Sequence, residues 1–287
     1  MTKTNCVLTL DRAMYHRDEV GIDAPCLSSS IASILLRDSP QHAYVAHPKL
    51  GGVPREDSET FDLGTAAHDY ILEGTEDRYA IIDAEDWRTK AAKEARTRAR
   101  EDGRTPLLRR HVESVRAMSQ AVRSQLAAFE DAPMPLADGH PEQTLVWQDG
   151  GVWCKARLDW LSTDRRTIDD LKTGAVSARP EAWTRTLYGA GRDLQAAFYL
   201  RGLKAITGHD ATFRFVVAEN AYPYAVSVIA LSPEALAHAD AKVQRAIEAW
   251  GRCLHYDSWP GYPTRTCYVD PPAWALAQEL DASEAAS

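Results

Sequence analysis

One stretch limits the fold of this chain more than any other: residues 152–173 have the pattern of a β-hairpin. The predicted arms are Val152–Leu161 and Thr167–Thr173, joined by the polar loop Thr163–Arg166. Alternate residues of a strand point to opposite faces, and the first arm alternates apolar with polar or charged side chains. The apolar residues of that arm are Val152, Cys154, Ala156, Leu158 and Trp160. The stretch therefore predicts two neighbouring strands with one face buried.

The other face of this hairpin carries two acids. If Ser162 pairs with Thr167, Asp159 lies directly opposite Asp170, with Cβ atoms about 5 Å apart. Two facing carboxylates repel each other unless a positive charge lies nearby, and Lys172 follows on the same face. This arrangement suits a divalent metal ion beside an ammonium group. A surface hairpin with solvated charges is the alternative, because short motifs of this kind have a high false-positive rate.

A second hairpin is predicted just before the first. Residues 142–148 alternate and end at Asp149-Gly150, a strong turn signal. Pairing Gln148 with Gly151 makes Glu142 face Arg157 and yields a three-stranded meander. Its polar face would present Glu142 and Arg157 beside the two acids, whereas Asp169 would point the other way in a structural role.

Two helices bring further candidate residues. Residues 61–73 are expected to form a helix that carries His68, although a lone histidine on such a face is more often part of a core. Residues 192–206 predict a helix with Arg192, Gln195 and Tyr199 on one stripe. A glutamine and a tyrosine on a partly buried stripe need polar partners, which a ligand or the strand ends could supply.

A third helix is expected over residues 25–38, opening with several serines. A hydroxyl-rich helix N-terminus that includes Ser28 and Ser30 can hold a phosphate. Ordinary N-capping explains the same serines more simply.

Composition excludes several classes of protein. No apolar run approaches the roughly 20 residues needed to cross a bilayer, and the first 20 residues lack the apolar region of a signal peptide. Five cysteines without a C-x-x-C pair form neither a disulfide framework nor a zinc knuckle. We therefore expect a reduced, cytoplasmic protein.

Charge is unevenly distributed along the chain. The net charge is −8, yet residues 88–116 contain ten Lys/Arg and four Asp/Glu. A basic segment on an acidic body can follow a polyanion such as DNA. A solvated charged helix is an equally good interpretation.

Taken in order, these motifs resemble a known family. A helical His68, then Asp159, then Asp170-Leu171-Lys172 and finally Gln195-x-x-x-Tyr199 resemble the PD-(D/E)xK nucleases of the RecB-like class. The RecE-type exonucleases, that is exodeoxyribonuclease VIII and its phage relatives, share more. The shared phrases, spread over residues 27–275, include FDLGTAAHDYILEG, CKARLDWL, DLKT, LQAAFYL and WPGYP.

The chain departs from the family pattern at three places. Leu158 stands where the proline that gives the motif its name is expected, and Arg192 stands where an aromatic residue is expected. The four-cysteine set that holds an iron–sulfur cluster in some relatives is absent, so no such cluster is expected.

The resemblance implies an α/β (α+β) fold with a restriction-endonuclease-like core, in which a central mixed sheet with a β-meander is flanked by helices. Residues 1–287 would form a single nuclease domain. Its parts would be an N-terminal helical part (about 25–130), a catalytic core (about 140–255) and a C-terminal arm (256–287) that lies against the body.

The resemblance also implies a mechanism. His68, Asp159, Asp170 and the Leu171 carbonyl would hold Mg²⁺, with Mn²⁺ able to substitute, and Lys172 would act on the attacking water. Gln195 and Tyr199 would hold the DNA backbone or order the active-site face. Glu142, Arg157 and Arg192 would support the site or contact DNA.

The implied activity is 5′→3′ degradation of double-stranded DNA from its ends, leaving 3′ single-stranded tails for an annealing protein. By the same resemblance the protein would be a ring-shaped homo-oligomer. Three alternatives stay open: a RecB-like single-strand or structure-specific nuclease, a catalytically silent DNA-end-binding module, and an interaction protein whose acidic face binds no metal.

Overall fold

A six-stranded mixed sheet forms the centre of the part of the chain that the computed structural model describes, residues 5–53 and 59–273, with the backbone alone at 59–65. The strand order is β1-β4-β5-β6-β7-β8, and among these neighbours only β6 and β7 are parallel. The strands are β1 (Cys6–Thr9), β4 (Gly139–Asp149), β5 (Val152–Ser162), β6 (Thr167–Gly174), β7 (Thr212–Glu219) and β8 (Val226–Ile229). The predicted mixed α/β fold with its meander, β4-β5-β6, is confirmed.

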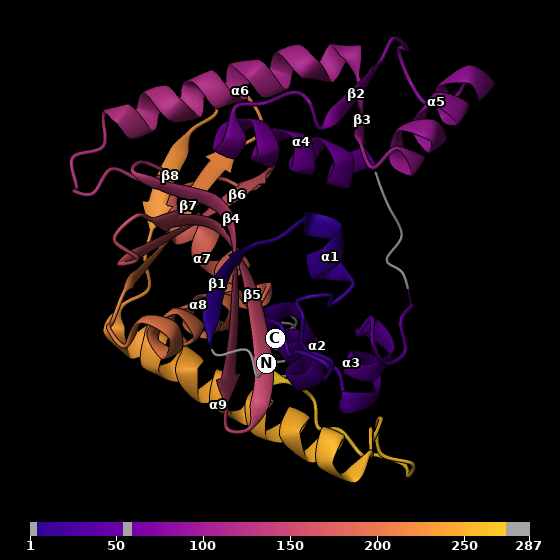
Figure 1. Ribbon diagram of the computed structural model, residues 1–287, viewed down its shortest axis with the longest axis vertical. Coiled ribbons are helices and arrows are strands. Elements are labelled where there is room, and N and C mark those ends of the chain that lie inside the picture. Colours follow the sequence, from indigo (N-terminus) through magenta and orange to yellow (C-terminus); the bar gives the residue numbers. More distant parts are fainter. Residues whose placement is uncertain (1–4, 54–58, 274–287) are drawn as a thin grey trace, which may run out of the picture.

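Helices cover both faces of this sheet. The main core lies between one face and the helices α2 (Ser29–Arg37), α3 (Pro40–Ala46), α7 (Pro180–Gly189), α8 (Arg192–Thr207) and α9 (Pro233–Tyr256). A second core lies under α4 (Glu59–Glu73) and α6 (Arg109–Ala127) on the other face. Figure 1 shows α6 along one edge of the molecule and α9 along the opposite edge, with the sheet between them. Among the described helices none is long and apolar enough to cross a membrane.

A small βαβ unit stands beside α4. The strands β2 (Tyr79–Ile82) and β3 (Thr105–Leu108) pair in parallel, and the basic helix α5 (Lys90–Glu101) connects them. Figure 1 shows α5 standing apart from the main sheet. The predicted basic helix is therefore present. The strand β3 was not predicted, since it is only four residues long and contains a proline.

The β5–β6 hairpin has the predicted register where its ladder forms. Trp160 pairs with Asp169 and Leu161 with Ile168. The ladder between β5 and β6 stops before the expected Asp159–Asp170 pair. On its other side, β6 pairs in parallel with β7 along its whole length. Leu158 and Leu161 both enter the main core, so the alternation of side chains is interrupted between them, where Asp159 lies.

The predicted register of the β4–β5 hairpin is wrong by two residues. Asp149 pairs with Val152, so that Gly150 and Gly151 alone form the turn. Both glycines have positive φ, +56° and +82°, as a tight two-residue hairpin turn requires. Arg157 consequently pairs with Thr144 rather than with Glu142.

The N-terminal segment was not predicted to have structure. The strand β1 adds an edge to the sheet by pairing with β4, and α1 (Arg12–His16) follows it. The Lys155 ammonium lies 2.8 Å from Asp18 and donates a hydrogen bond to the Tyr15 carbonyl at 2.7 Å. The segment is thus fixed to β5 through a buried ion pair that sequence periodicity does not reveal.

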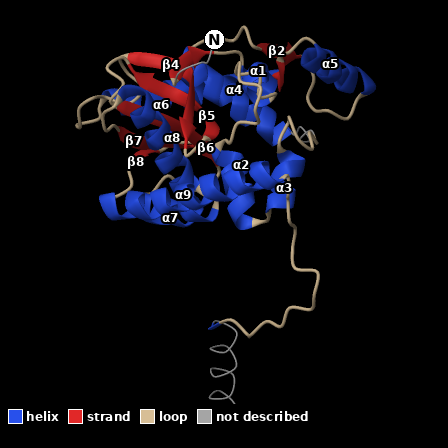
Figure 2. Cartoon of the chain, turned by 60° about the horizontal axis from the view of Figure 1, so that its bottom comes forward, coloured by secondary structure: helices blue, strands red, loops and turns tan. Residues whose placement is uncertain are grey.

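The predicted C-terminal arm packs against the body only at its start. The Trp259 ring lies 5.0 Å from that of Trp250, and the Gln41 amide donates to the Pro260 carbonyl at 3.2 Å. Residues 263–273 are exposed and extend away from the body (Figure 2). The expectation of a packed arm is wrong for this part because its ring contacts end with Tyr262, whose ring lies against His42; residues 274–287 lie outside the described part.

Candidate functional site

The helix α4 places His68 against the acids of the meander. Ala66 and Ile71 of this helix are buried in the second core, which turns His68 toward β5. Its Nε2 atom lies 3.0 Å from Asp159 Oδ2, and its Nδ1 atom lies 3.5 Å from Glu142 Oε1. His68 is therefore part of a polar cluster rather than of an apolar core.

Asp159 is held by the neighbouring strand. The Leu171 amide donates to Asp159 Oδ2 at 2.8 Å. On the same strand β6, the buried Asp170 forms an ion pair with Lys172. The two acids are thus anchored on adjacent strands, as predicted, although no regular backbone pairing joins them.

The helix α8 supports Asp170 from the other face of the sheet. Gln195 Nε2 donates to Asp170 Oδ1 at 2.8 Å, and Arg192 Nη1 donates to Gln195 Oε1 at 3.1 Å. Tyr199 is buried one turn further along, with its ring 6.0 Å from that of Phe213. Arg192, which departs from the family pattern, therefore serves to orient Gln195.

Glu142 and Arg157 meet despite the wrong register. The Arg157 guanidinium bonds Glu142 Oε2, and it also donates to the Leu10 carbonyl at 2.8 Å. Glu142 has a positive φ of +57°, and its neighbours Pro141 and Gln143 pair with residues on either side of Asp159. Glu142 therefore lies opposite Asp159 on the neighbouring strand.

Sequence reasoning missed three residues at this site. Arg12 Nη2 lies 2.9 Å from Asp69 Oδ1 and 3.7 Å from Glu142 Oε1. Asp69 and Glu73 share one side of α4, since residues four apart on a helix are neighbours. That spacing was visible in the sequence HDYILE, whereas nothing in the sequence indicates that the N-terminal segment brings Arg12 here.

Other predicted residues have local roles. Ser28 caps α2 by accepting from the Ile31 amide at 3.4 Å, and its hydroxyl bonds that of Ser30 at 3.0 Å. The capping interpretation accounts for both hydroxyls. Asp169 forms a buried ion pair with Arg214, with nitrogen–oxygen distances of 2.7 and 2.9 Å, in keeping with a structural role.

The protonation of the site follows from its burial and its charges. Burial acts to lower the pKa of His68, but the charge of Asp159 and a hydrogen bond to it, with help from Asp69 and Glu142, raise it to about 10. Burial acts to raise the pKa of Asp159, but His68, Lys172 and the Leu171 amide lower it to about 2. Without a bound cation, His68 and Asp159 therefore form an ion pair at neutral pH.

Asp170 has the opposite tendency. Burial and the charge of Asp159 raise its pKa, Lys172 lowers it, and the net result is a pKa of about 6. Two carboxylates kept near each other with such different pKa values are a mark of a functional site.

The donors at this site suit a divalent cation. One ligand atom each from His68, Glu142 and Asp159 can lie within 4.8 Å of the others. His68 Nδ1 and Glu142 Oε1 are buried and make no hydrogen bond to the residues described. Buried polar atoms without partners are rare, and a cation would satisfy these. Carboxylate oxygens with one imidazole form a ligand set for Mg²⁺ or Mn²⁺.

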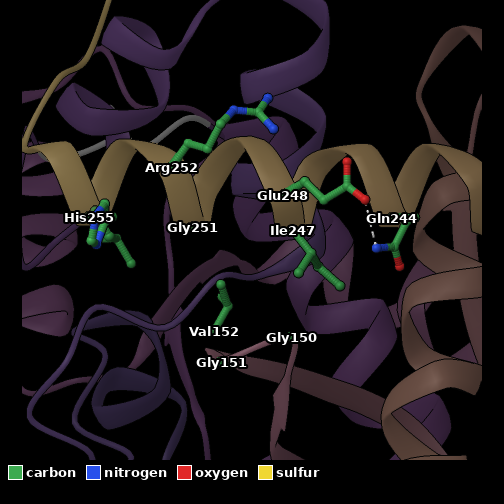
Figure 3. Close-up of a pocket in the computed structure, with 10 residues that line it drawn as sticks. Gly150, Gly151, Val152, Gln244, Ile247, Glu248, Gly251, Arg252 and His255 are labelled. Atoms are coloured by element: carbon green, nitrogen blue, oxygen red, sulfur yellow. Dashed lines mark hydrogen bonds between the residues drawn. The ribbon is translucent and has the colours of Figure 1, made fainter.

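A pocket of about 560 Å³ lies elsewhere, between the Gly150–Gly151 turn and α9 (Figure 3). Val152 at this pocket is seven residues from Asp159 along β5, roughly 23 Å at the rise of a strand. The polar cluster, rather than this pocket, is the candidate site.

Comparison with known proteins agrees with this geometry at the level of fold. The chain is similar to the crystal structure of a proposed exonuclease from Eubacterium rectale, with a TM-score of 0.58 and 14% identity over 94% of this chain and 98% of that one. A phage-related exonuclease from Haemophilus somnus 129PT matches with a TM-score of 0.31 and 12% identity over 80% and 95% of the two chains, too low a score to support an argument. No curated protein matches the chain.

A family model covers most of the chain, from residue 29 to residue 270. Its description confirms the predicted PD-(D/E)xK class, while the narrower resemblance to RecE-type exonucleases stays a prediction. The chain belongs to the family described as a PDDEXK-like domain of unknown function.

Proposed function

We propose that this protein is a divalent-metal-dependent DNA exonuclease. The observation that carries the proposal is the convergence of His68, Asp159 and the Asp170–Lys172 pair from three elements of the fold. Membership of a PDDEXK-like family, a class that implies a divalent metal ion, supports it. The Eubacterium rectale protein, whose fold is similar, is named as a proposed exonuclease, which agrees with it.

The proposed ligands are His68, Asp159, Asp170 and the Leu171 carbonyl. Glu142 is added because its carboxylate lies in one cluster with His68 and Asp159. A bound Mg²⁺ or Mn²⁺ supplies Lewis acidity, which neutralises charge on the phosphoryl oxygens and lowers the pKa of a bound water. The acids supply the hard oxygen ligands that such an ion prefers.

The remaining residues have proposed roles in the same reaction. The Lys172 ammonium, held beside Asp170, orients the attacking water and stabilises charge that develops on the phosphate. Gln195 fixes one oxygen of Asp170, and Lys172 pairs with the other. Tyr199 orders the buried side of α8, and Arg192 holds Gln195.

The proposed substrate is the end of linear double-stranded DNA, degraded 5′→3′ to leave a 3′ single-stranded tail. The proposed partners are further copies of this chain in a ring and a single-strand annealing protein. These details rest on the resemblance of the motifs. The basic helix α5 adds a positively charged surface that could follow the phosphate backbone.

The direct test uses end-labelled linear duplex DNA with Mg²⁺. We expect nucleotide release that stops in EDTA, and a loss of at least about 100-fold in Lys172→Ala. Lys204→Ala is the matched control, because Lys204 pairs with Asp210 on the surface and should keep full activity. Unchanged activity of Lys172→Ala would refute the assignment.

The same assay separates the alternatives. Faster degradation of single-stranded or branched DNA would favour a RecB-like nuclease. Binding of duplex ends without cleavage in Mg²⁺ and Mn²⁺ would favour a silent end-binding module.

A further inference from the structure

A second group of acids lies beside the candidate site, on α4 and β4. Asp69 and Glu73 are one helical turn apart, and together with Glu142 they can bring one ligand oxygen each within 4.8 Å of the others. The Asp69 side chain is fully buried, and those of Glu142 and Glu73 are 10% and 16% exposed. We refer to Asp69, Glu73 and Glu142 as the acidic triad.

Each carboxylate of the acidic triad has one oxygen paired with an arginine. The pairs are Arg12 with Asp69 at 2.9 Å, Arg78 with Glu73 at 3.1 Å, and Arg157 with Glu142. The arginines come from three different elements or loops, so they hold the three acids from different directions.

The other oxygen of each carboxylate is buried and has no hydrogen-bond partner among the described residues. These atoms are Asp69 Oδ2, Glu73 Oε1 and Glu142 Oε1. Two positive groups, His68 Nδ1 and Arg12 Nη2, lie 3.5 and 3.7 Å from Glu142 Oε1, and neither makes a hydrogen bond to it. A buried charged oxygen without a partner is costly, and three of them together indicate a place for a cation.

We propose that the acidic triad binds a second divalent cation. All three donors are oxygens, which favours a hard ion such as Mg²⁺, Mn²⁺ or Ca²⁺. Glu142 belongs to both donor sets, so one carboxylate would join the two ions. The second ion would hold α4 against β4, because Asp69 and Glu73 belong to α4 and Glu142 belongs to β4.

This inference rests on the proposed function in one respect: Glu142 is also a ligand of the metal site proposed there. Counting bound ions without DNA tests it separately. If the wild-type protein binds two ions but degrades no DNA, the nuclease proposal falls and the second cation site stands.

The experiment counts Mn²⁺ bound per chain by electron paramagnetic resonance of free Mn²⁺. We expect two ions in the wild type, one in Glu73→Gln and one in His68→Ala, which removes a ligand of the first site alone. Glu76→Gln is the matched control, because Glu76 lies three residues beyond Glu73, in the loop after α4, and Arg116 occupies both of its oxygens. This variant should bind two ions.

Circular dichroism confirms folding of each variant, and Asp69→Asn replaces Glu73→Gln if the latter does not fold. Fewer than two ions in the wild type, or any count other than one in the folded acidic-triad variant, overturns the inference.

Discussion

At the scale of single residues, His68 and Asp159 determine each other's protonation state at the candidate site. A pKa of about 10 for His68 and about 2 for Asp159 describes an ion pair in the absence of a cation. A metal ligand must be deprotonated, so at the proposed metal site the imidazolium proton of His68 and the cation would compete for the same position. Without a cation, the ion pair holds the His68 ring 3.0 Å from Asp159.

Proton release on metal binding follows from this competition. At pH 7 we expect about one proton to leave per cation bound at the His68 site. Affinity should rise with pH and level off above the His68 pKa of about 10. Calorimetric titration of Mn²⁺ in two buffers of different ionisation enthalpy measures the release. In His68→Ala the release should vanish, and equal heats in both buffers for the wild type would contradict the ion pair.

The adjacent acids Asp169 and Asp170 should respond oppositely to the same substitution. Asp169→Asn leaves Arg214 buried without its partner, at a cost of about 3–5 kcal/mol of unfolding free energy. Asp170 has a raised pKa of about 6, so its charged form is disfavoured in the fold. Asp170→Asn should therefore be no less stable than the wild type at pH 8.

Urea denaturation of both variants measures this contrast. Any advantage of Asp170→Asn should shrink as pH falls below about 6, because protonation neutralises the wild-type acid as well. Nuclease activity should be lost in Asp170→Asn, and a large loss of stability in that variant would contradict the role given to Asp170.

At the scale of elements, strong local patterns predicted most of the architecture. Alternation along most of β5 needed no tertiary information, and neither did the helix α8 with its polar stripe; both elements form as expected. The predicted register of β4 with β5 was wrong because Gly150 and Gly151 form the turn, whereas Asp149 and Gly150 were expected there. The short elements β1, β3 and α3 were missed because four to seven residues carry too little periodicity, and their stability comes from contacts far along the chain.

A glycine lets the helix α8 pack closely against the sheet. A Cβ atom at Gly202 of α8 would lie 2.7 Å from the fully buried Trp147 ring of β4. Gly202→Ala should therefore reduce the free energy of unfolding by about 1–3 kcal/mol. Gly189→Ala, at the end of α7 with no atom within 4 Å, is the matched control and should cost nothing. Thermal unfolding of both variants checks the prediction, which fails if their stabilities are equal.

At the scale of the whole molecule, the site joins the two layers of helices across the sheet. His68 reaches Asp159 from the α4 layer, and Gln195 reaches Asp170 from the α8 layer. The motifs in the sequence identified these residues, although they lie more than a hundred positions apart. The acidic triad and Arg12 were not identified, because their association depends on how α4 and the N-terminal segment pack.

Cation binding should therefore stabilise the whole fold. With Mn²⁺ at 100 times its dissociation constant, the free energy of unfolding should rise by about 2.7 kcal/mol. The melting temperature with and without Mn²⁺ measures the effect, and His68→Ala should lose most of it. Equal melting temperatures in the wild type would show that no cation binds the folded state preferentially.

The division of the site between two layers also has a consequence for the cell that makes this protein. The residues proposed to cut DNA meet only after the strands β5 and β6 are in place and a helix has docked on each side. A nascent or partly unfolded chain does not bring these residues together, so the proposed nuclease activity should appear only once folding is complete.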